Sequence, residues 1–141
     1  MVKPDLVAAK LTELADRVGR VRGACPDTAD ALARDRDALD LVSFNLMLAV
    51  QVCADLASHV IADEGWPAAR GLAEGFHRLR EHGILSPGTT TALTKAVGLR
   101  NVVAHGYAAV DTQLVFAAAR EGLADVEAFA TEVASWVNSR T

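Results

Sequence analysis

The apolar residues recur with the period of an α-helix along most of the chain. In the first segment they step by four, three, four and three positions: Val7, Leu11, Leu14, Val18 and Val21. This spacing puts them on one face and predicts a first helix over about residues 5–22. Glycine, proline and two capping residues at positions 23–28 then predict a loop followed by a new helix start.

A second, long helix is predicted over about residues 28–62. From Leu41 to Cys53 nearly every position is apolar or small, and a helix that is apolar on most sides must be buried on most sides. This calls for other helices around it and favours a second subunit. Asn45, Gln51 and His59 interrupt the pattern, and their favoured interpretation is structural polar groups rather than catalytic ones. Asp55 lies four residues before His59, so these two side chains could pair.

Three further helices complete the predicted fold. One covers about residues 68–82 and closes at Gly83, and the next begins after Ser86 as N-cap with Pro87 in its first turn. The last helix is capped by Asp111 and continues to the C-terminus. Its inner face is predicted by the helical spacing of Val115, Ala119, Val126, Phe129, Val133 and either Trp136 or Val137. No segment alternates in the manner of a strand. We therefore predict a single all-α domain over residues 1–141, an up-and-down bundle of about five helices.

Composition restricts the compartment and the partners. No uninterrupted apolar run approaches the roughly 18 residues that span a bilayer, and the first residues lack a signal-peptide core, so we expect a cytoplasmic protein that does not bind membranes. The net charge of −4 argues against bulk attraction to nucleic acid. RNA would therefore bind at a local patch, for which the basic candidates are Arg70, Arg78, Arg80, Lys95 and Arg100. For each of these except Arg100, a solvated helix surface is the favoured interpretation.

Metal-binding and redox patterns are weak. Cys25 and Cys53 lie far apart, without the spacing of a zinc or redox pair. Glu74 and His77 match one half of the Glu-x-x-His motif of di-iron bundles, which needs a second copy that this sequence does not have. We therefore expect neither a metal nor a cofactor.

The densest chemistry lies in Leu99-Arg100-Asn101-Val102-Val103-Ala104-His105-Gly106-Tyr107. Arginine presents a permanently charged fork of donors to phosphate, and the unperturbed histidine pKa lies close to neutrality. On one straight helix Arg100 and His105 are about 140° and about 7.5 Å apart, so they do not point at a common atom. Either the helix ends near Gly106, or a two-fold dimer brings two copies of the segment face to face.

This segment resembles the R-x-x-x-x-H signature of the HEPN superfamily, and the added tyrosine gives the R-x-x-x-x-H-x-Y form of HepT-like ribonuclease toxins. Arg100, His105 and Tyr107 occupy the three named positions, and Asn101 fits the common Arg-Asn start. In that family the motif lies near the end of a fourth helix, with a last helix after it. The chain is similar to the family from about residue 6 to residue 137.

The resemblance implies a metal-independent endoribonuclease toxin that cleaves RNA at a dimeric site. Arg100 and His105 would be catalytic and Asn101 supporting. Tyr107 would accept AMP from a small nucleotidyltransferase antitoxin of the MntA kind, which would neutralise the toxin. The alternative is a non-catalytic HEPN binding module that partners a nucleotidyltransferase and keeps these residues by descent.

Overall fold

A computed structural model describes residues 2–105 and 111–140 of the chain. Within these ranges the protein contains helices and no strand. The elements are α1 (Pro4–Ala24), α2 (Ala29–Arg34), α3 (Arg36–Glu64), α4 (Leu72–Glu81), α5 (Pro87–Ala104), α6 (Thr112–Ala117), the π-helical turn η1 (Ala118–Gly122) and α7 (Leu123–Ser139). Because α6, η1 and α7 follow one another without interruption, the described chain forms six helical runs. The predicted all-α bundle is confirmed.

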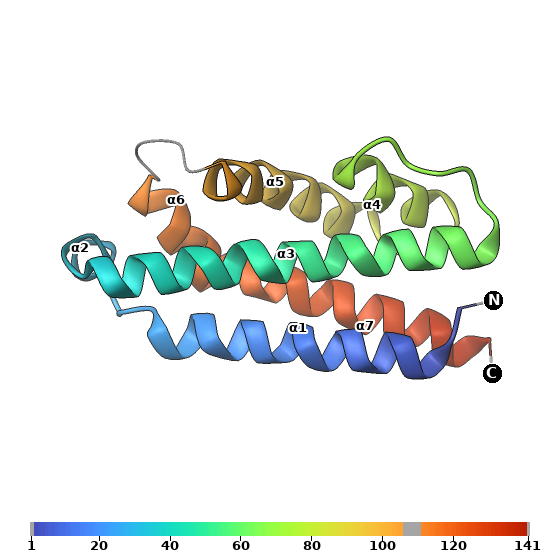
Figure 1. The fold of residues 1–141 in the computed structure, drawn as a ribbon, viewed down its shortest axis with the longest axis horizontal. Coiled ribbons are helices and arrows are strands. Elements are labelled where there is room, and N and C mark those ends of the chain that lie inside the picture. Colours follow the sequence, from blue (N-terminus) through green and yellow to red (C-terminus); the bar gives the residue numbers. More distant parts are fainter. Residues whose placement is uncertain (1, 106–110, 141) are drawn as a thin grey trace.

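The long helices lie side by side along the length of the molecule. Figure 1 shows α1, α3 and α7 running along the long axis, with α4 and α5 forming the layer on the other side of α3, and with both termini at the same end. α3 packs against α1, α4, α5 and α7 and is therefore the centre of the bundle. One core runs through all these helices, with Phe76 of α4 and Phe129 of α7 meeting edge to face at 5.8 Å between ring centroids.

The central position of α3 explains its composition. By length and hydropathy alone α3 could cross a membrane, but 61% of its most apolar 18-residue window is buried inside the bundle. Leu46, Ala49, Cys53, Leu56 and Val60 all face other helices there. Most of the apolar run is therefore accounted for by packing against the helices around α3.

The predicted second helix is wrong in one respect, because the chain breaks at Asp35. Thr28 caps α2 by accepting a hydrogen bond from the Ala31 N–H, as the sequence indicated. Asp35 then leaves the helical region, with φ −112° and ψ 92°, and its side chain accepts from the Ala38 N–H to begin α3. A short aspartate side chain bonds well to free N–H groups at a helix start, and here that alternative replaces continuous helix.

The last helix also differs from the prediction. Asp111 caps it as expected, accepting from the Gln113 N–H, but the helix widens into a π turn at η1, which ends at Gly122. The predicted inner face is confirmed, since Val115, Ala119, Val126 and Phe129 are all buried. The wider turn changes the winding of the helix without interrupting its buried face.

The helix that carries the motif is fixed firmly at its start. Ser86 is the N-cap of α5, with its hydroxyl accepting from the Thr89 N–H at 3.2 Å. Glu132 of α7 reaches across and accepts from the Ser86 N–H and the Thr89 hydroxyl, each at 2.6 Å. Buried Leu93 and Val97 hold the following turns against the core. The direction of α5, and so the place where it ends, is set by these contacts.

Candidate functional site

The motif occupies the last turn of α5 and the residue that ends it. α5 stops at Ala104, and His105 is the C-cap, with its backbone N–H bonded to the Asn101 carbonyl at 3.1 Å. α5 therefore ends directly before Gly106, as predicted. Gly106 and Tyr107 themselves lie outside the described residues. His105 is exposed, while the side chain of Arg100 is half-buried between α5 and α3.

The Arg100 guanidinium is held by two side-chain amides. Its Nε and Nη2 both donate to Oε1 of Gln51 on α3, at 3.1 and 2.8 Å, and its Nη1 donates to Oδ1 of Asn101 at 3.1 Å. Gln51 in turn donates from Nε2 to Oδ1 of Asp55 at 2.9 Å. A chain of hydrogen bonds therefore runs from Asp55 through Gln51 and Arg100 to Asn101, joining two helices that are far apart in sequence.

This arrangement leaves Arg100 with two donors to offer. A guanidinium carries five N–H groups, of which one belongs to Nε and two to each terminal nitrogen. Among the described residues, three of the five are engaged by Gln51 and Asn101, so one N–H remains on Nη1 and one on Nη2. Two donors on neighbouring nitrogens match two non-bridging phosphate oxygens. The charge remains available too, since both oxygens that hold the guanidinium belong to neutral amides.

Two sequence interpretations change at this point. Asp55 accepts a hydrogen bond from Gln51 instead of pairing with His59, so the predicted pairing was wrong. His59 is exposed on the C-terminal half of α3. Gln51 was interpreted as a structural polar group, whereas it contacts the arginine of the motif directly. Asn45 does fit that interpretation, because it donates to the Leu41 carbonyl and accepts from Arg17.

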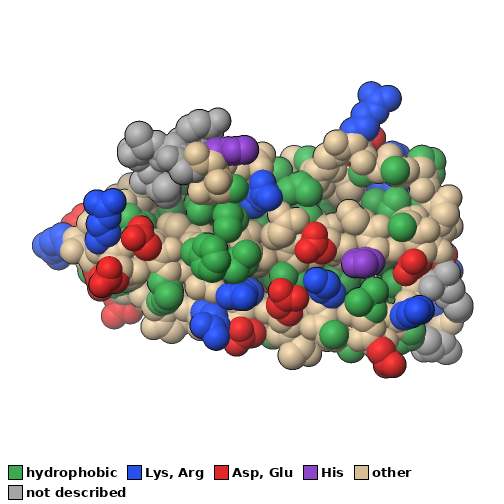
Figure 2. Space-filling view, viewed as in Figure 1, with side chains coloured by type: hydrophobic (Ala, Val, Ile, Leu, Met, Phe, Trp, Pro, Cys, Tyr) green, Lys and Arg blue, Asp and Glu red, His purple; other side chains and the backbone are tan. Residues whose placement is uncertain are grey.

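An apolar patch adjoins this polar chain on the same face of α3. Leu41 and Phe44 are 47% and 51% exposed, although they belong to the most apolar helix of the protein. Phe44 precedes Gln51 by seven positions, which on a helix is about 20° in rotation and about 10.5 Å in rise. Figure 2 shows hydrophobic side chains gathered over the first half of α3 on this face, below the end of α5.

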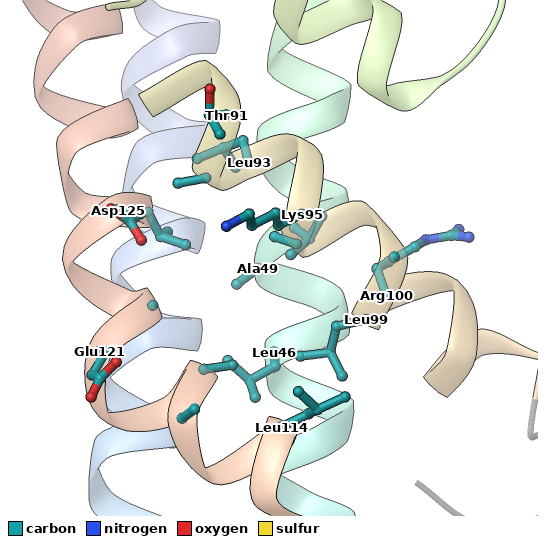
Figure 3. A pocket seen from close by; sticks show the side chains of 18 of the residues that line it. Leu46, Ala49, Thr91, Leu93, Lys95, Leu99, Arg100, Leu114, Glu121 and Asp125 are labelled. Atoms are coloured by element: carbon teal, nitrogen blue, oxygen red, sulfur yellow. The ribbon is translucent and has the colours of Figure 1, made fainter. Parts of the chain in front are cut away.

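The basic candidates do not form one patch with Arg100. Arg78 forms salt bridges with Glu74 and Glu81, at 3.2 and 3.1 Å between nitrogen and oxygen. These lie in a part of the bundle remote from the end of α5. Lys95 points to the other side of α5 from Arg100, as Figure 3 shows. Arg78 and Lys95 therefore fit the favoured interpretation of a solvated helix surface, and Arg100 remains the basic candidate next to His105.

A large groove lies on that other side of α5. It has a volume of about 1070 Å³ between α3, α5 and the α6–α7 run, with Leu46, Ala49 and Leu93 in its wall. Glu121 and Asp125 of the α6–α7 run lie along its edge in Figure 3. Although Arg100 forms part of its boundary, the guanidinium points away from it. The groove is therefore distinct from the surface that Arg100, Phe44 and Gln51 share.

The isolated Glu-x-x-His half-motif has a different role. Glu74 accepts from the Arg70 backbone N–H and from Arg78, while the His77 ring lies 3.4 Å from the Thr94 hydroxyl. Within residues 2–105 and 111–140, no group of three or more histidine, cysteine, aspartate or glutamate side chains is placed to hold a metal ion. Glu74 thus stabilises the start of α4.

The all-α bundle, with Arg100 and His105 at the end of its penultimate long helix, has the fold of a HEPN toxin of known structure. Comparison with known proteins makes this specific, since the profile of the family described as "Ribonuclease HepT-like" matches residues 14–133. The chain therefore belongs to the HepT-like ribonuclease family. Among characterised relatives, the mRNA nuclease HepT of Shewanella oneidensis is 23% identical over 125 residues, covering 89% of this chain and 93% of that protein.

Solved structures share the fold. A tri-AMPylated HEPN toxin of Shewanella oneidensis in complex with an MNT antitoxin superposes with a TM-score of 0.86 at 22% identity, over 93% of this chain and 98% of that one. YutE of Bacillus subtilis, a cytosolic protein of unknown function, gives a TM-score of 0.85 at 9% identity, over 99% of this chain and 93% of its own. The bundle is thus common to proteins that share little sequence.

Proposed function

We propose that this protein is the toxin of a HepT/MntA-type toxin–antitoxin system and acts as a metal-independent endoribonuclease in the cytoplasm. The observation that carries the proposal is the state of Arg100, which is fixed by three hydrogen bonds and, among the described residues, still has an unengaged donor on each terminal nitrogen. His105 lies five residues further, at the end of the same helix. Membership of the HepT-like family supports RNA as the substrate.

The reaction that suits these residues uses the 2′-hydroxyl of the RNA as nucleophile. A base takes the 2′-hydroxyl proton while the oxygen attacks the adjacent phosphorus, and an acid gives a proton to the 5′-oxygen as its bond to phosphorus breaks. The products are a 2′,3′-cyclic phosphate and a free 5′-hydroxyl. Arg100 would hold the non-bridging oxygens, which gain negative charge in the transition state. Asn101 would support it by holding Nη1.

Base and acid would come from two copies of His105 in a two-fold dimer. Each proton carrier contributes about 10²–10⁴-fold to such a reaction. A surface is available for the dimer, because Leu41 and Phe44 are exposed on the face of α3 that also carries Gln51 and its contact with Arg100. A two-fold axis near this face would bring two copies of Arg100 and His105 toward each other.

The proposed partner is an MntA-like nucleotidyltransferase that transfers AMP to Tyr107. This part of the proposal stands on the sequence motif, since Tyr107 lies outside the described residues. It is supported by the Shewanella oneidensis toxin, which was solved AMPylated and bound to an MNT antitoxin. A phosphodiester two residues from His105 would add negative charge and bulk where RNA phosphates must approach.

One experiment tests the catalytic proposal. Purified wild type and His105→Ala are incubated with total cellular RNA in excess chelator, at several salt concentrations, and the intact mass of each protein is measured. We expect cleavage by the wild type alone. Cleavage by both proteins would refute the assignment of His105, and no cleavage by a wild type of unmodified mass would favour a binding module that partners the nucleotidyltransferase.

A further inference from the structure

We propose that Gln51 is a positioning residue for Arg100 and that Asp55 fixes the orientation of Gln51. The inference rests on the proposed nuclease function and adds to it two residues of α3 that lie about fifty positions from the motif. Neither belongs to the R-x-x-x-x-H-x-Y pattern. What they determine is the direction in which the guanidinium points.

Gln51 constrains Arg100 through a single oxygen. Oε1 accepts from both Nε and Nη2, so the side edge of the planar guanidinium is bound to a point on α3. An arginine side chain is otherwise free to rotate about several bonds, and Arg100 is only half-buried. With one edge bound and Nη1 held by Asn101, the plane of the group is fixed before any phosphate arrives.

Asp55 determines which end of the Gln51 amide faces the arginine. A carboxylate only accepts hydrogen bonds, so the group that bonds to Asp55 Oδ1 at 2.9 Å must be the amide nitrogen of Gln51. The amide oxygen then points toward Arg100. Were the amide reversed, two donor groups would face each other at Arg100 and two acceptors at Asp55.

A neutral amide at position 51 also preserves the charge of the site. A carboxylate in direct contact with Arg100 would offset the positive charge that attracts phosphate. Asp55 carries a carboxylate, but Gln51 stands between it and the guanidinium. The arrangement therefore fixes the direction of the guanidinium without placing a negative charge in direct contact with it.

A purely structural role for Gln51 is a poorer explanation. α5 is already fixed by the Ser86 cap, its bonds to Glu132, and the buried side chains Leu93 and Val97. Removing one half-buried amide leaves all of these contacts in place. The consequence of losing Gln51 should therefore appear in the behaviour of Arg100 rather than in the folding of the bundle.

The test compares Gln51→Leu with the matched control Gln113→Leu, which removes the other glutamine of the chain from the exposed surface of α6. The steady-state rate of RNA cleavage is measured against RNA concentration for both, in the wild-type and the Arg100→Ala backgrounds. We expect Gln51→Leu to lower kcat about tenfold or more with little change in KM, and Gln113→Leu to have no effect. In the Arg100→Ala background Gln51→Leu should cause no further loss, because its effect passes through the arginine. An equal further loss there would overturn the inference.

Gln51→Glu gives a second, different signature. It keeps an acceptor for Arg100 but adds negative charge and loses the donor to Asp55, so RNA binding should weaken and its salt dependence should become shallower. Binding that is as tight and as salt-dependent as in the wild type would contradict the charge argument.

A spectroscopic readout separates this inference from the nuclease proposal. The Arg100 Nε–H resonance, assigned by its disappearance in Arg100→Lys, should be protected from solvent exchange in the wild type and in Gln113→Leu, and unprotected in Gln51→Leu. This holds whether or not RNA is cleaved. Unchanged protection in Gln51→Leu would show that Gln51 does not position Arg100. If protection is lost in Gln51→Leu but the wild type does not cleave RNA, only the nuclease proposal would be refuted.

Discussion

Phe44→Glu tests whether the exposed face of α3 is the dimer interface that the proposed mechanism needs. Phe44 is 51% exposed, so the substitution leaves the core of the monomer largely intact. In a two-fold dimer with its axis near this face, both copies of the phenylalanine would be covered by the partner. We expect the variant to be folded, monomeric and without nuclease activity.

The size of the effect follows from the exposed area. A phenylalanine side chain offers about 200 Å², of which the 51% exposed part is about 100 Å², or about 200 Å² for the two copies. At about 25 cal/mol per Å² this corresponds to about 5 kcal/mol of dimer stability. Covering only half of the area still contributes about 2.5 kcal/mol, which is more than about fiftyfold in the dissociation constant. Two glutamates near a two-fold axis would add repulsion to this loss.

The assay measures mass and activity on the same samples. Sedimentation velocity over a range of protein concentrations gives the dissociation constant, circular dichroism checks the helical fold, and RNA cleavage is followed in parallel. The matched control is Leu114→Glu, which places the same charge on a 61% exposed side chain of α6 that faces the groove instead. A Phe44→Glu protein that remains dimeric, or that cleaves RNA as a monomer, would refute the reasoning. Dissociation by Leu114→Glu alone would assign the interface to the groove.

Two predictions concern the rest of the chain. Asp35→Ala removes the side chain that begins α3, so the free energy of unfolding measured in urea should fall by about 1 kcal/mol, whereas a rise would show that continuous helix is preferred there. Burial raises the pKa of the Cys53 thiol and, more weakly, that of Cys25, with Arg120 opposing the shift at Cys25. A disulfide reagent at pH 8 should therefore label Cys25 more slowly than a free thiol and faster as the pH rises, and should reach Cys53 only in denaturant; equal labelling of both cysteines in the native protein would contradict the buried placement.

The sequence by itself determined the elements whose signals are local. Helical spacing of apolar residues identified the buried faces of α1 and α7, and Ser86 and Asp111 were found as N-caps because capping depends on the next two or three residues. The end of α5 beside Gly106 was local in the same sense. The motif from Arg100 to Tyr107 spans eight consecutive positions, so it could be identified from the sequence alone.

Where local signals compete, the tertiary structure decided. The charged stretch around Asp35 is compatible both with a continuous helix and with a new N-cap. The break is evident only in the tertiary structure, where α2 packs against α3 and α6. Position 122 is likewise compatible with a regular helix, but the chain forms a π turn there.

The contacts of Arg100 could not be derived from the sequence. Its partner Gln51 is 49 positions away, and the pairing depends on the point at which α5 crosses α3. That crossing is set by the packing of Leu93 and Val97 against other helices and by the bonds to Glu132. The sequence can place Leu93 and Val97 on one helix face, but it does not show which helix they meet. Residue types on one helix show what chemistry is available, whereas the packing of two helices decides which of those groups meet.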